Sequence, residues 1–480
     1  MNLNPADSFR FSRKVGYGLR PDENPGDVLD WAIAQMEAVT TSVGIAHYRE
    51  PTVVPWPAKY NWSLEERVAH LVAYKKASDK LDKQKNVTND QRDDLENRHH
   101  QRLYDILRHC TDAVYTTAPV FERFANFWAN HFTVGENSES TMVVGHYTDA
   151  AIKANMVRDF AAMLYDVETH PAMLSYLDAQ YSIGPHSHLG LEFHAQGKYA
   201  DINENLAREM LELHTISPKA GYTQADITNV AKVLTGWGYT MQLPADHDFP
   251  PKERWRVFRK NWHEPGTKTV LGQTIPQGQG GLRVLTDFLA ARAEARDFIS
   301  FKLAHHFIRE EPTANDVAVI SKAWQDGKGD LPTIHKAVLQ LAATETEARK
   351  FMQPECWLFQ MIRMSGATLF RGFEELDDAG DNQIDRRSDK ILTELGQNNW
   401  SIRQPDGFSD KRVDWVSPEH MERRVRFAQI VRIGGKPTLD ADAVADRYMA
   451  TPETRALVGK AQDGVGKFTL LFCSPEFTEA

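Results

Sequence analysis

The sequence has few cysteines. There are only three in 480 residues, and they lie far apart at Cys110, Cys356 and Cys473. None belongs to a Cys-x-x-Cys pair, which argues against a thiolate zinc cluster, and an odd, scattered set argues against a disulfide framework. Because a chain of this length builds a hydrophobic core without such cross-links, we expect apolar burial to stabilise the fold.

Long apolar runs are also missing. No stretch approaches the roughly 18 consecutive apolar residues of a membrane-spanning helix, and the mean hydropathy is −0.50. The first residues, MNLNPADSFRFSRKVGYG, contain no apolar run that could serve as a secretory signal. The pair Arg386-Arg387 is internal and cannot be an export signal. We therefore predict a cytoplasmic chain without a membrane span, unless it is exported while bound to a partner.

The sequence has no excess of positive charge. Its 66 acidic residues outnumber its 56 basic ones, and the formal net charge is −10. A broad cationic face for nucleic acid is therefore not expected. A glycine-rich phosphate loop and a Gly-x-Ser-x-Gly nucleophile elbow are absent as well. These absences exclude several common enzyme classes and leave an ordinary globular composition, with 41% apolar residues.

Apolar residues recur with helical spacing along most of the chain. This pattern predicts a mainly α-helical protein, a large multi-helix bundle. We also expect a short β-hairpin over 255–275, around the turn sequence HEPG, and a long ordered loop over 397–418. The predicted helices include 103–114, 120–132, 148–165, 171–177, 203–214, 224–234, 281–293, 297–307, 316–324, 331–342 and 356–364. No fixed-period repeat is visible, so a solenoid is not favoured.

Residues 75–102 are almost entirely polar. A helix leads into them, because Ser63 and Glu66 have the spacing of a capping box. A solvated helical hairpin or a mobile insertion is the simplest interpretation. The alternative is a docking arm for a partner.

The segment NENLAREMLELH carries the most informative polar pattern. Glu209 lies at the edge of the apolar stripe of this predicted helix, where a carboxylate needs a compensating partner. Glu209 and Glu212 are three residues apart, so their carboxylates can converge on a cation or share a proton. The alternative is an ion-pair ladder, because Arg208 lies four residues from both Glu204 and Glu212. His214 is a poor co-ligand for Glu212 unless the helix unwinds there.

Two further segments place polar residues in unusual surroundings. In FWANHF, Asn130 and His131 lie among aromatic residues, so His131 is either a buried structural histidine or a ligand or general base. In NWHEPGTK, proline and glycine predict a turn that presents His263, Glu264 and Lys268 from one rim. A hairpin with surface polar residues is the simpler interpretation of the second segment.

Several long motifs occur here in one order: FERFANFWANHFTV, HPAMLSYLDAQYSIGP, NENLAREMLELHTI, GYTQADITNVAKVLTGWGY and HEPGTKTVLG. Together they resemble the large bacterial family filed as domain of unknown function 1800, and the likeness spans nearly the whole chain. Length alone suggests roughly three domains, whereas the resemblance implies a single helical domain over 1–480, with 75–102 as an insertion. The resemblance does not indicate which reaction the protein catalyses. It implies that such genes often accompany a second uncharacterised family whose members look like sulfatases and alkaline phosphatases.

The resemblance also points to particular positions. Ile216-Ser217-Pro218 stands where the family usually has a glycine that ends the helix, so the helix exit is expected to differ. The family's characteristic polar positions correspond here to Asn130, His131, Asn203, Glu204, Asn205, Arg208, Glu209, Glu212, His263, Glu264 and Lys268.

Two hypotheses follow from these residues. The first is an enzyme with a divalent metal, iron, manganese or zinc, that performs hydrolysis or oxidation. Its catalytic and metal-binding residues would be His131, Glu209, Glu212 and His263. The residues that orient these ligands or bind substrate would be Asn130, Asn203, Glu204, Asn205, Arg208, Glu264 and Lys268. The second hypothesis is a non-catalytic assembly or chaperone-like partner of the co-encoded sulfatase- or phosphatase-like protein, in which buried polar networks specify packing.

Overall fold

Helices dominate the structure. The computed structural model describes residues 3–41, 62–84, 86–97, 101–136, 141–239, 256–370, 387–398, 400–402 and 404–480. These residues form 23 α-helices and two two-stranded antiparallel sheets, which confirms the prediction of a mainly α-helical fold. Some predicted features include positions outside the described residues, namely 85, 98–100, 255, 386, 399 and 403.

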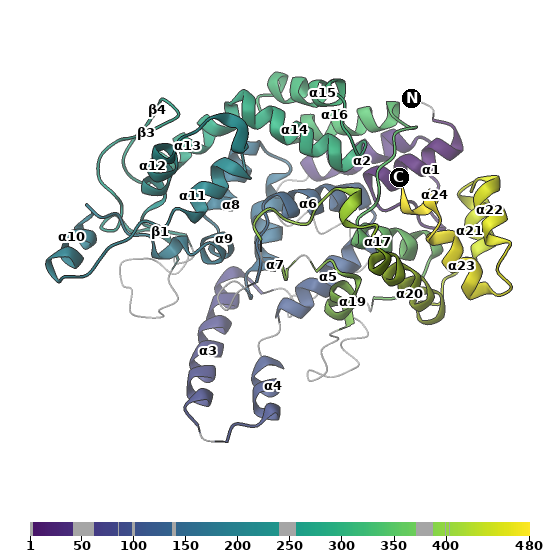
Figure 1. Cartoon of the computed structure of the whole chain (residues 1–480), viewed down its shortest axis with the longest axis horizontal. Helices are drawn as coiled ribbons and strands as arrows, with labels where there is room; N and C mark the ends of the chain where they lie inside the picture. Colours follow the sequence, from purple (N-terminus) through teal and green to yellow (C-terminus); the bar gives the residue numbers. More distant parts are fainter. Residues whose placement is uncertain are drawn as a thin grey trace.

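The first half of the chain runs from one end of the elongated molecule to the other and carries the sheet strands β1 and β2 (Figure 1). Its elements are α1 (Pro5–Val15), α2 (Val28–Thr41), α3 (Leu64–Asp82), α4 (Asn89–Asn97), α5 (Gln101–Tyr115), α6 (Pro119–His131), α7 (Val144–Tyr147), η3 (Thr148–Ile152), η4 (Lys153–Asn155), α8 (Phe160–Glu168), α9 (Pro171–Tyr176), η5 (Ala179–Tyr181), α10 (His188–Ala195), α11 (Asn205–Glu212), η6 (Pro218–Ala220), α12 (Gln224–Leu234), β1 (Trp237–Gly238) and β2 (Val257–Phe258).

The second half returns toward the amino-terminal end, so that both termini lie at the same end of the molecule (Figure 1). Its elements are β3 (Lys268–Val270), β4 (Gln273–Ile275), α13 (Gly280–Ala291), α14 (Ala293–Phe307), α15 (Ala314–Asp326), α16 (Leu331–Thr344), α17 (Pro354–Ser365), α19 (Arg387–Leu395), η8 (Arg412–Asp414), α20 (Pro418–Gly434), α21 (Ala441–Arg447), α22 (Pro452–Val458), α23 (Gly464–Phe472) and α24 (Pro475–Thr478).

Helix α6 lies at the centre of the core. All its residues from Pro119 to Trp128 are buried, as expected for a helix that is apolar around most of its circumference. The rings of Phe124 and Phe307 stack with centroids 4.3 Å apart, which packs α6 on α14. The Trp128 indole N–H donates to Nε2 of His335, 2.9 Å away on α16. The carboxyl end of α6 is therefore held rigidly, and it carries Asn130 and His131.

The predicted hairpin over 255–275 is present only in part, because its two expected strands do not pair with each other. Strand β2 pairs with β1, whereas β3 pairs with β4. Leu271 and Gly272 connect β3 to β4 and have φ values of +50° and +81°, which suits a two-residue hairpin turn. Residues between β2 and β3 are instead held against the end of α12, since the His263 imidazole bonds to the carbonyl of Thr235.

The predicted helix over 148–165 is interrupted. It begins as a π-helical turn, η3, passes through η4, and restarts as α8. The Asp159 carboxylate accepts the N–H of Ala162 at 2.8 Å and so caps α8. The backbone of Asp159 also forms a bridge with Asp330. A favourable cap and a long-range backbone contact therefore outweigh the helical periodicity.

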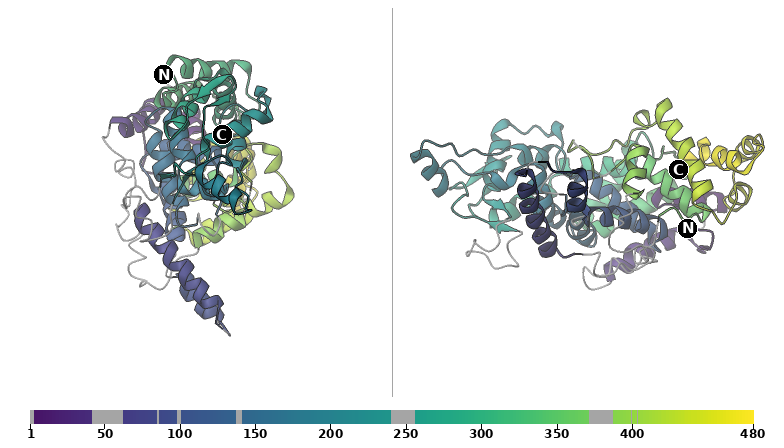
Figure 2. Two further views of the ribbon diagram at one scale, coloured as in Figure 1. Left: turned by 90° about the vertical axis from the view of Figure 1, so that its left-hand side faces the viewer. Right: turned by 90° about the horizontal axis from the view of Figure 1, so that it is seen from below.

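The polar stretch forms a helical arm, α3 and α4, that projects away from the body (Figures 1 and 2). The predicted capping box is present, with Ser63 and Glu66 bonded to each other's backbone N–H. The root of the arm is anchored by a buried ion pair. Both side chains of the pair, Arg67 and Asp105, are 1% exposed, and Arg67 also donates to the carbonyl of Met142 at 2.9 Å.

Removing one partner of this pair should destabilise the protein strongly, because the other charge is then buried without compensation. We expect Asp105→Asn to lower the free energy of unfolding by about 3–5 kcal/mol. The control is Arg92→Met, which removes the arm's Arg92–Asp82 pair; both of those side chains are 53% exposed, and the expected loss is below about 1 kcal/mol. Equilibrium urea unfolding measures both, and equal losses would contradict the anchoring role of Arg67 and Asp105.

Candidate functional site

The imidazole of His131 connects two other segments of the chain. Its Nε2 lies 3.2 Å from the carbonyl oxygen of His214, and its Nδ1 lies 2.9 Å from Nζ of Lys302 on α14. Since a carbonyl only accepts, the His131 proton is on Nε2, and Nδ1 accepts from Lys302. His131 is 2% exposed, and burial together with Lys302 lowers its pKa well below the usual value. His131 is therefore a neutral, fully bonded imidazole.

The exit of α11 turns His214 into the interior. The helix ends at Glu212, and the N–H groups of Leu213 and His214 both bond to the carbonyl of Glu209. Ser217 then adopts φ +73° and ψ 151°, a conformation that favours glycine. The family resemblance implied a glycine at this position. The backbone here adopts a glycine-like conformation although the residue is serine.

In the interior, the His214 side chain forms a buried pair with Glu168 at the end of α8. Its Nδ1–H donates to Oε1 of Glu168 at 2.8 Å, and both side chains are 0% exposed. The other ring nitrogen, Nε2, and the other oxygen of Glu168, Oε2, have no partner among the described residues. A carboxylate that fixes the tautomer of a histidine leaves the opposite nitrogen with a free lone pair.

Glu209 lies beside this pair and is half-buried. Its carboxylate has no ion pair or hydrogen bond within the described residues, unlike Glu212, which bonds to Arg208 at 3.1 Å. Burial raises the pKa of Glu209, and Glu212 and Asp406 raise it further, against the opposing effects of His214 and Arg208. Burial, Glu209 and Asp406 likewise raise the pKa of Tyr176 to about 12. Glu209, Tyr176 and Asp406 thus influence one another at this site.

Asp406 belongs to a strap, residues 404–411, that lies against the carboxyl end of α6. The side chain of Asn130 holds it, because Asn130 Nδ2 donates to the carbonyl of Phe408 at 2.9 Å and Oδ1 accepts the Phe408 N–H at 2.8 Å. Gly407 has φ +79°, and a Cβ there would lie 2.5 Å from the carbonyl oxygen of Asn130. Glycine is therefore required where the strap passes the helix.

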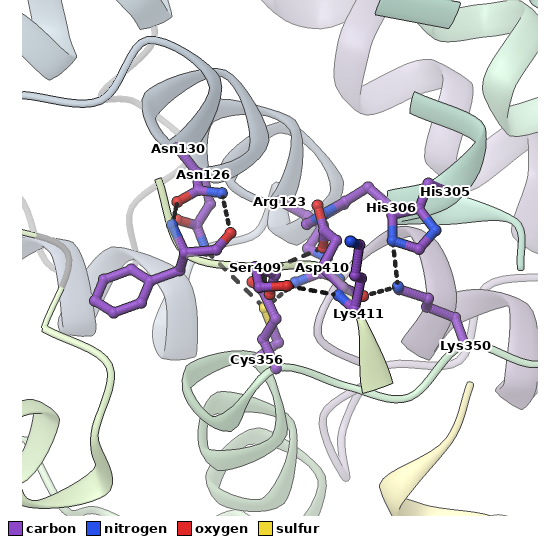
Figure 3. A network of polar contacts seen from close by, with 12 residues as sticks. Arg123, Asn126, Asn130, His305, His306, Lys350, Cys356, Ser409, Asp410 and Lys411 are labelled. Atoms are coloured by element: carbon purple, nitrogen blue, oxygen red, sulfur yellow. Dashed lines mark hydrogen bonds and ion pairs between the residues drawn. The ribbon is translucent and has the colours of Figure 1, made fainter. Parts of the chain in front are cut away.

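The far end of the strap is held by Asp410 (Figure 3). His306 Nδ1 lies 2.7 Å from Oδ1 of Asp410, Gln353 Nε2 donates to the same oxygen at 3.2 Å, and Lys350 donates to the Asp410 carbonyl. Burial alone would raise the pKa of Asp410, but His306 and Lys350 outweigh it and hold the pKa well below its usual range. Arg123, which contacts the thiol of Cys356, completes this network.

The segment around His263 lies apart from Glu209. His263 Nδ1–H donates to the Thr235 carbonyl at 2.9 Å, and Nε2 accepts the Gly278 N–H at 3.0 Å. The Glu264 carboxylate binds the exposed ring of His186 at 2.6 Å and the His186 N–H at 3.0 Å. Lys268 donates to the Glu264 carbonyl. These contacts organise the loop between β2 and β3, and no contact in the described part of the chain joins His263 to Glu209.

The remaining polar residues of the α11 segment are also engaged elsewhere. Glu204 accepts from Gln224 at 2.7 Å and from Thr228 at 2.6 Å, so the ladder predicted through Arg208 exists only toward Glu212. Asn203 donates to the carbonyl of Leu177 at 3.0 Å and accepts the N–H of Asn205. These bonds of Glu204 and Asn203 fix the position of α11, and they do not contact the carboxylates of Glu209 and Glu212.

The predicted ligand set is thus brought together only in part. Glu209 and His131 contact the same backbone segment, since the backbone carbonyl of Glu209 accepts the N–H of His214 and His131 bonds to the His214 carbonyl. His131 and His263 each use both ring nitrogens. Among the described residues, no three His, Cys, Asp or Glu side chains are grouped so that they could hold a metal ion. The metal site stays a prediction from the sequence.

Sequence reasoning missed several members of this site, above all His214, Glu168, Lys302 and Asp406. His214 was set aside because helical spacing points it away from Glu212, but the helix ends first. Lys302 lies in the predicted helix over 297–307, and helical spacing does not show that it contacts His131 on another helix. Asp406 lies in a loop without periodicity, and a Pro-Asp-Gly turn sequence is its only signal.

Comparison with known proteins identifies a family. The family model described as "Protein of unknown function (DUF1800)" matches residues 10–479. No curated protein and no solved structure gives a significant match. Among the described residues, no helix combines the length and apolar character that crossing a membrane requires.

The buried imidazoles predict a pH dependence of stability. Burial lowers the pKa of His335 to about 3, whereas an unfolded histidine titrates near 6.5. Below that value the unfolded state binds more protons, so stability falls as the pH is lowered, by up to about 1.4 kcal/mol per pH unit for each such histidine. We expect His335→Gln to reduce the dependence of the unfolding free energy on pH between pH 6 and pH 4 by up to about 1.4 kcal/mol per pH unit. Urea unfolding across this range measures it, and an unchanged slope would show that His335 is not held neutral.

Proposed function

The chain belongs to the DUF1800 family, whose description names no reaction, and we propose that it is an enzyme that transfers protons at Glu209 and His214 during hydrolysis. The observation that carries the proposal is the buried Glu168–His214 pair, in which Nδ1 is held at 2.8 Å and Nε2 has no partner among the described residues. An oriented imidazole with a free lone pair is suited to act as a general base.

Glu209 provides the complementary group. Burial raises its pKa, which favours a protonated carboxyl that can donate to a leaving group. An imidazole whose Nδ1–H is held by a carboxylate, next to a carboxyl group whose pKa is raised by burial, is the pattern expected of an acid–base pair. Perturbed pKa values also arise in structural networks, but Glu209 has no hydrogen-bonding partner in the described chain that would give it such a role.

A divalent metal remains part of this proposal, but with a different donor set from the His131, Glu209, Glu212 and His263 that the sequence predicted. If a metal binds here, His214 Nε2 and Glu209 are the donors that suit it, with Glu168 orienting the imidazole. Such an ion would activate water for hydrolysis. The test below therefore includes metal addition.

Glu209→Gln should lower kcat by about 10²–10⁴-fold, the usual contribution of a general acid or base. The matched control is Glu212→Gln, one turn away and already paired with Arg208, which should change the rate less than about threefold. The assay is hydrolysis of carboxylic and phosphate esters of p-nitrophenol, with and without Mn²⁺ or Zn²⁺. Full activity of Glu209→Gln, or equal losses in both variants, would contradict the assignment.

The second candidate function is the assembly partner, and the projecting arm favours it. Between Val72 and Leu95, no residue whose exposure the structure describes is buried, although burial is what normally stabilises helices of this length. A covering protein would supply that burial. The sulfatase- or phosphatase-like companion implied by the family resemblance is the candidate.

Replacing residues 72–97 by a short Gly-Ser linker should abolish co-purification with the co-expressed companion and leave the esterase assay unchanged. Binding that survives the deletion would contradict a docking role for the arm. The Arg92→Met variant, which changes one arm side chain only, serves as the folded control.

A further inference from the structure

Lys302 differs from two other interior lysines, Lys153 and Lys350, in that its amine faces no carboxylate in the described part of the chain. Lys153 lies 2.7 Å from a carboxylate oxygen of Glu122, and Lys350 lies 3.2 Å from one of Glu310. No carboxylate of the described residues comes within 4.0 Å of Lys302 Nζ. Its hydrogen-bonding partner is the neutral His131 ring at 2.9 Å. A lysine without a counter-ion in partly buried surroundings favours the free amine.

The partner imidazole is fixed in the form that accepts a proton. Because His131 Nε2–H donates to the His214 carbonyl, its Nδ1 lone pair points at Lys302. Phe127 and Trp128 pack against the ring, so it cannot turn easily. The amine therefore faces a base of defined tautomer.

We propose that Lys302 is a nucleophile that forms an imine with a small, uncharged aldehyde or ketone, with His131 as the base that receives its proton. The lone pair of Nζ attacks the carbonyl carbon, and the surplus amine proton moves to His131 Nδ1. His131 returns that proton to the alkoxide oxygen, which gives the carbinolamine. The second nitrogen proton follows the same route to the hydroxyl, which leaves as water while the C=N bond forms. Overall, one amine and one carbonyl compound give one imine and one water, and no oxidant is needed.

Three observations support this assignment. Lys302 is partly exposed, whereas Lys14, another lysine bonded to no carboxylate, is 3% exposed and bonded to two carbonyls. Burial lowers the pKa of Lys302 to about 8, against the effects of Asp410 and Asp406. These two carboxylates also disfavour an anionic substrate, and this points to the uncharged class. The inference goes beyond the proposed proton transfer at Glu209 and does not depend on it.

The experiment is reductive trapping on the intact wild-type chain. The protein is treated with limiting propanal and cyanoborohydride at pH 7.5, and modified lysines are quantified by peptide mass spectrometry. We expect Lys302 to be alkylated roughly tenfold or more faster than Lys390, whose side chain is 76% exposed, since an ordinary lysine has less than about 1% free amine at this pH. Labelling of Lys302 no faster than Lys390 overturns the proposal.

The controls distinguish a Lys302 that is activated by His131 from a lysine that merely has a low pKa. The pKa of Lys14 is lowered by burial to about 7, yet this lysine is only 3% exposed and lacks a neighbouring base, so it should remain unmodified. Equal labelling of Lys14 and Lys302 would overturn the role of His131.

His131→Asn should slow the labelling of Lys302 and leave the labelling of Lys390 unchanged. If Lys302 reacted faster with the anionic pyruvate than with propanal, the assignment of an uncharged substrate would be overturned. Glu209→Gln should leave the labelling intact, so failure of the proposed hydrolysis is distinguishable.

Discussion

The site depends on one buried imidazole that bonds on both sides. His131 donates to the backbone that follows α11 and accepts from a lysine of α14, so its neutral form joins three helices. Protonation of His131 while Lys302 is charged would place two positive charges side by side in surroundings of low dielectric constant, which is costly. The same constraint fixes the tautomer of His131, leaves the Lys302 amine without a counter-ion, and holds the helix exit that presents His214 to Glu168.

The strap extends this arrangement to the carboxyl-terminal half of the chain. Asn130 precedes His131 on α6 and binds the backbone of Phe408 through both ends of its amide. One helix end therefore positions an imidazole on one side and an acidic loop on the other. Buried polar networks of this kind specify a single arrangement when their members are satisfied. Nε2 of His214 and Oε2 of Glu168, which have no partner among the described residues, are exceptions here, and such exceptions are expected where a protein does chemistry.

The sequence predicted the parts of this structure that follow from periodicity and local chemistry. The helical fold, the capping box at Ser63, the buried surroundings of His131 and the half-buried position of Glu209 could be inferred, because helical spacing and aromatic surroundings carry that information. The convergence of Lys302, Asp406 and His214 could not, because it depends on where three distant segments pack. His263 illustrates the opposite error: a turn rich in polar residues suggested a ligand, whereas its two nitrogens bond to local backbone. Spacing alone also failed at the end of α11, where two residues beyond the helix decide which way His214 points.

The most direct test of this account is the tautomeric state of the two histidines, measured by long-range ¹H–¹⁵N correlation on histidine-labelled protein at neutral pH. The account predicts that His131 is neutral with its proton on Nε2, and that His214 is neutral with its proton on Nδ1. Assignment of both resonances by His131→Asn and His214→Asn makes the result unambiguous. A charged His131, or the same tautomer in both rings, would contradict it.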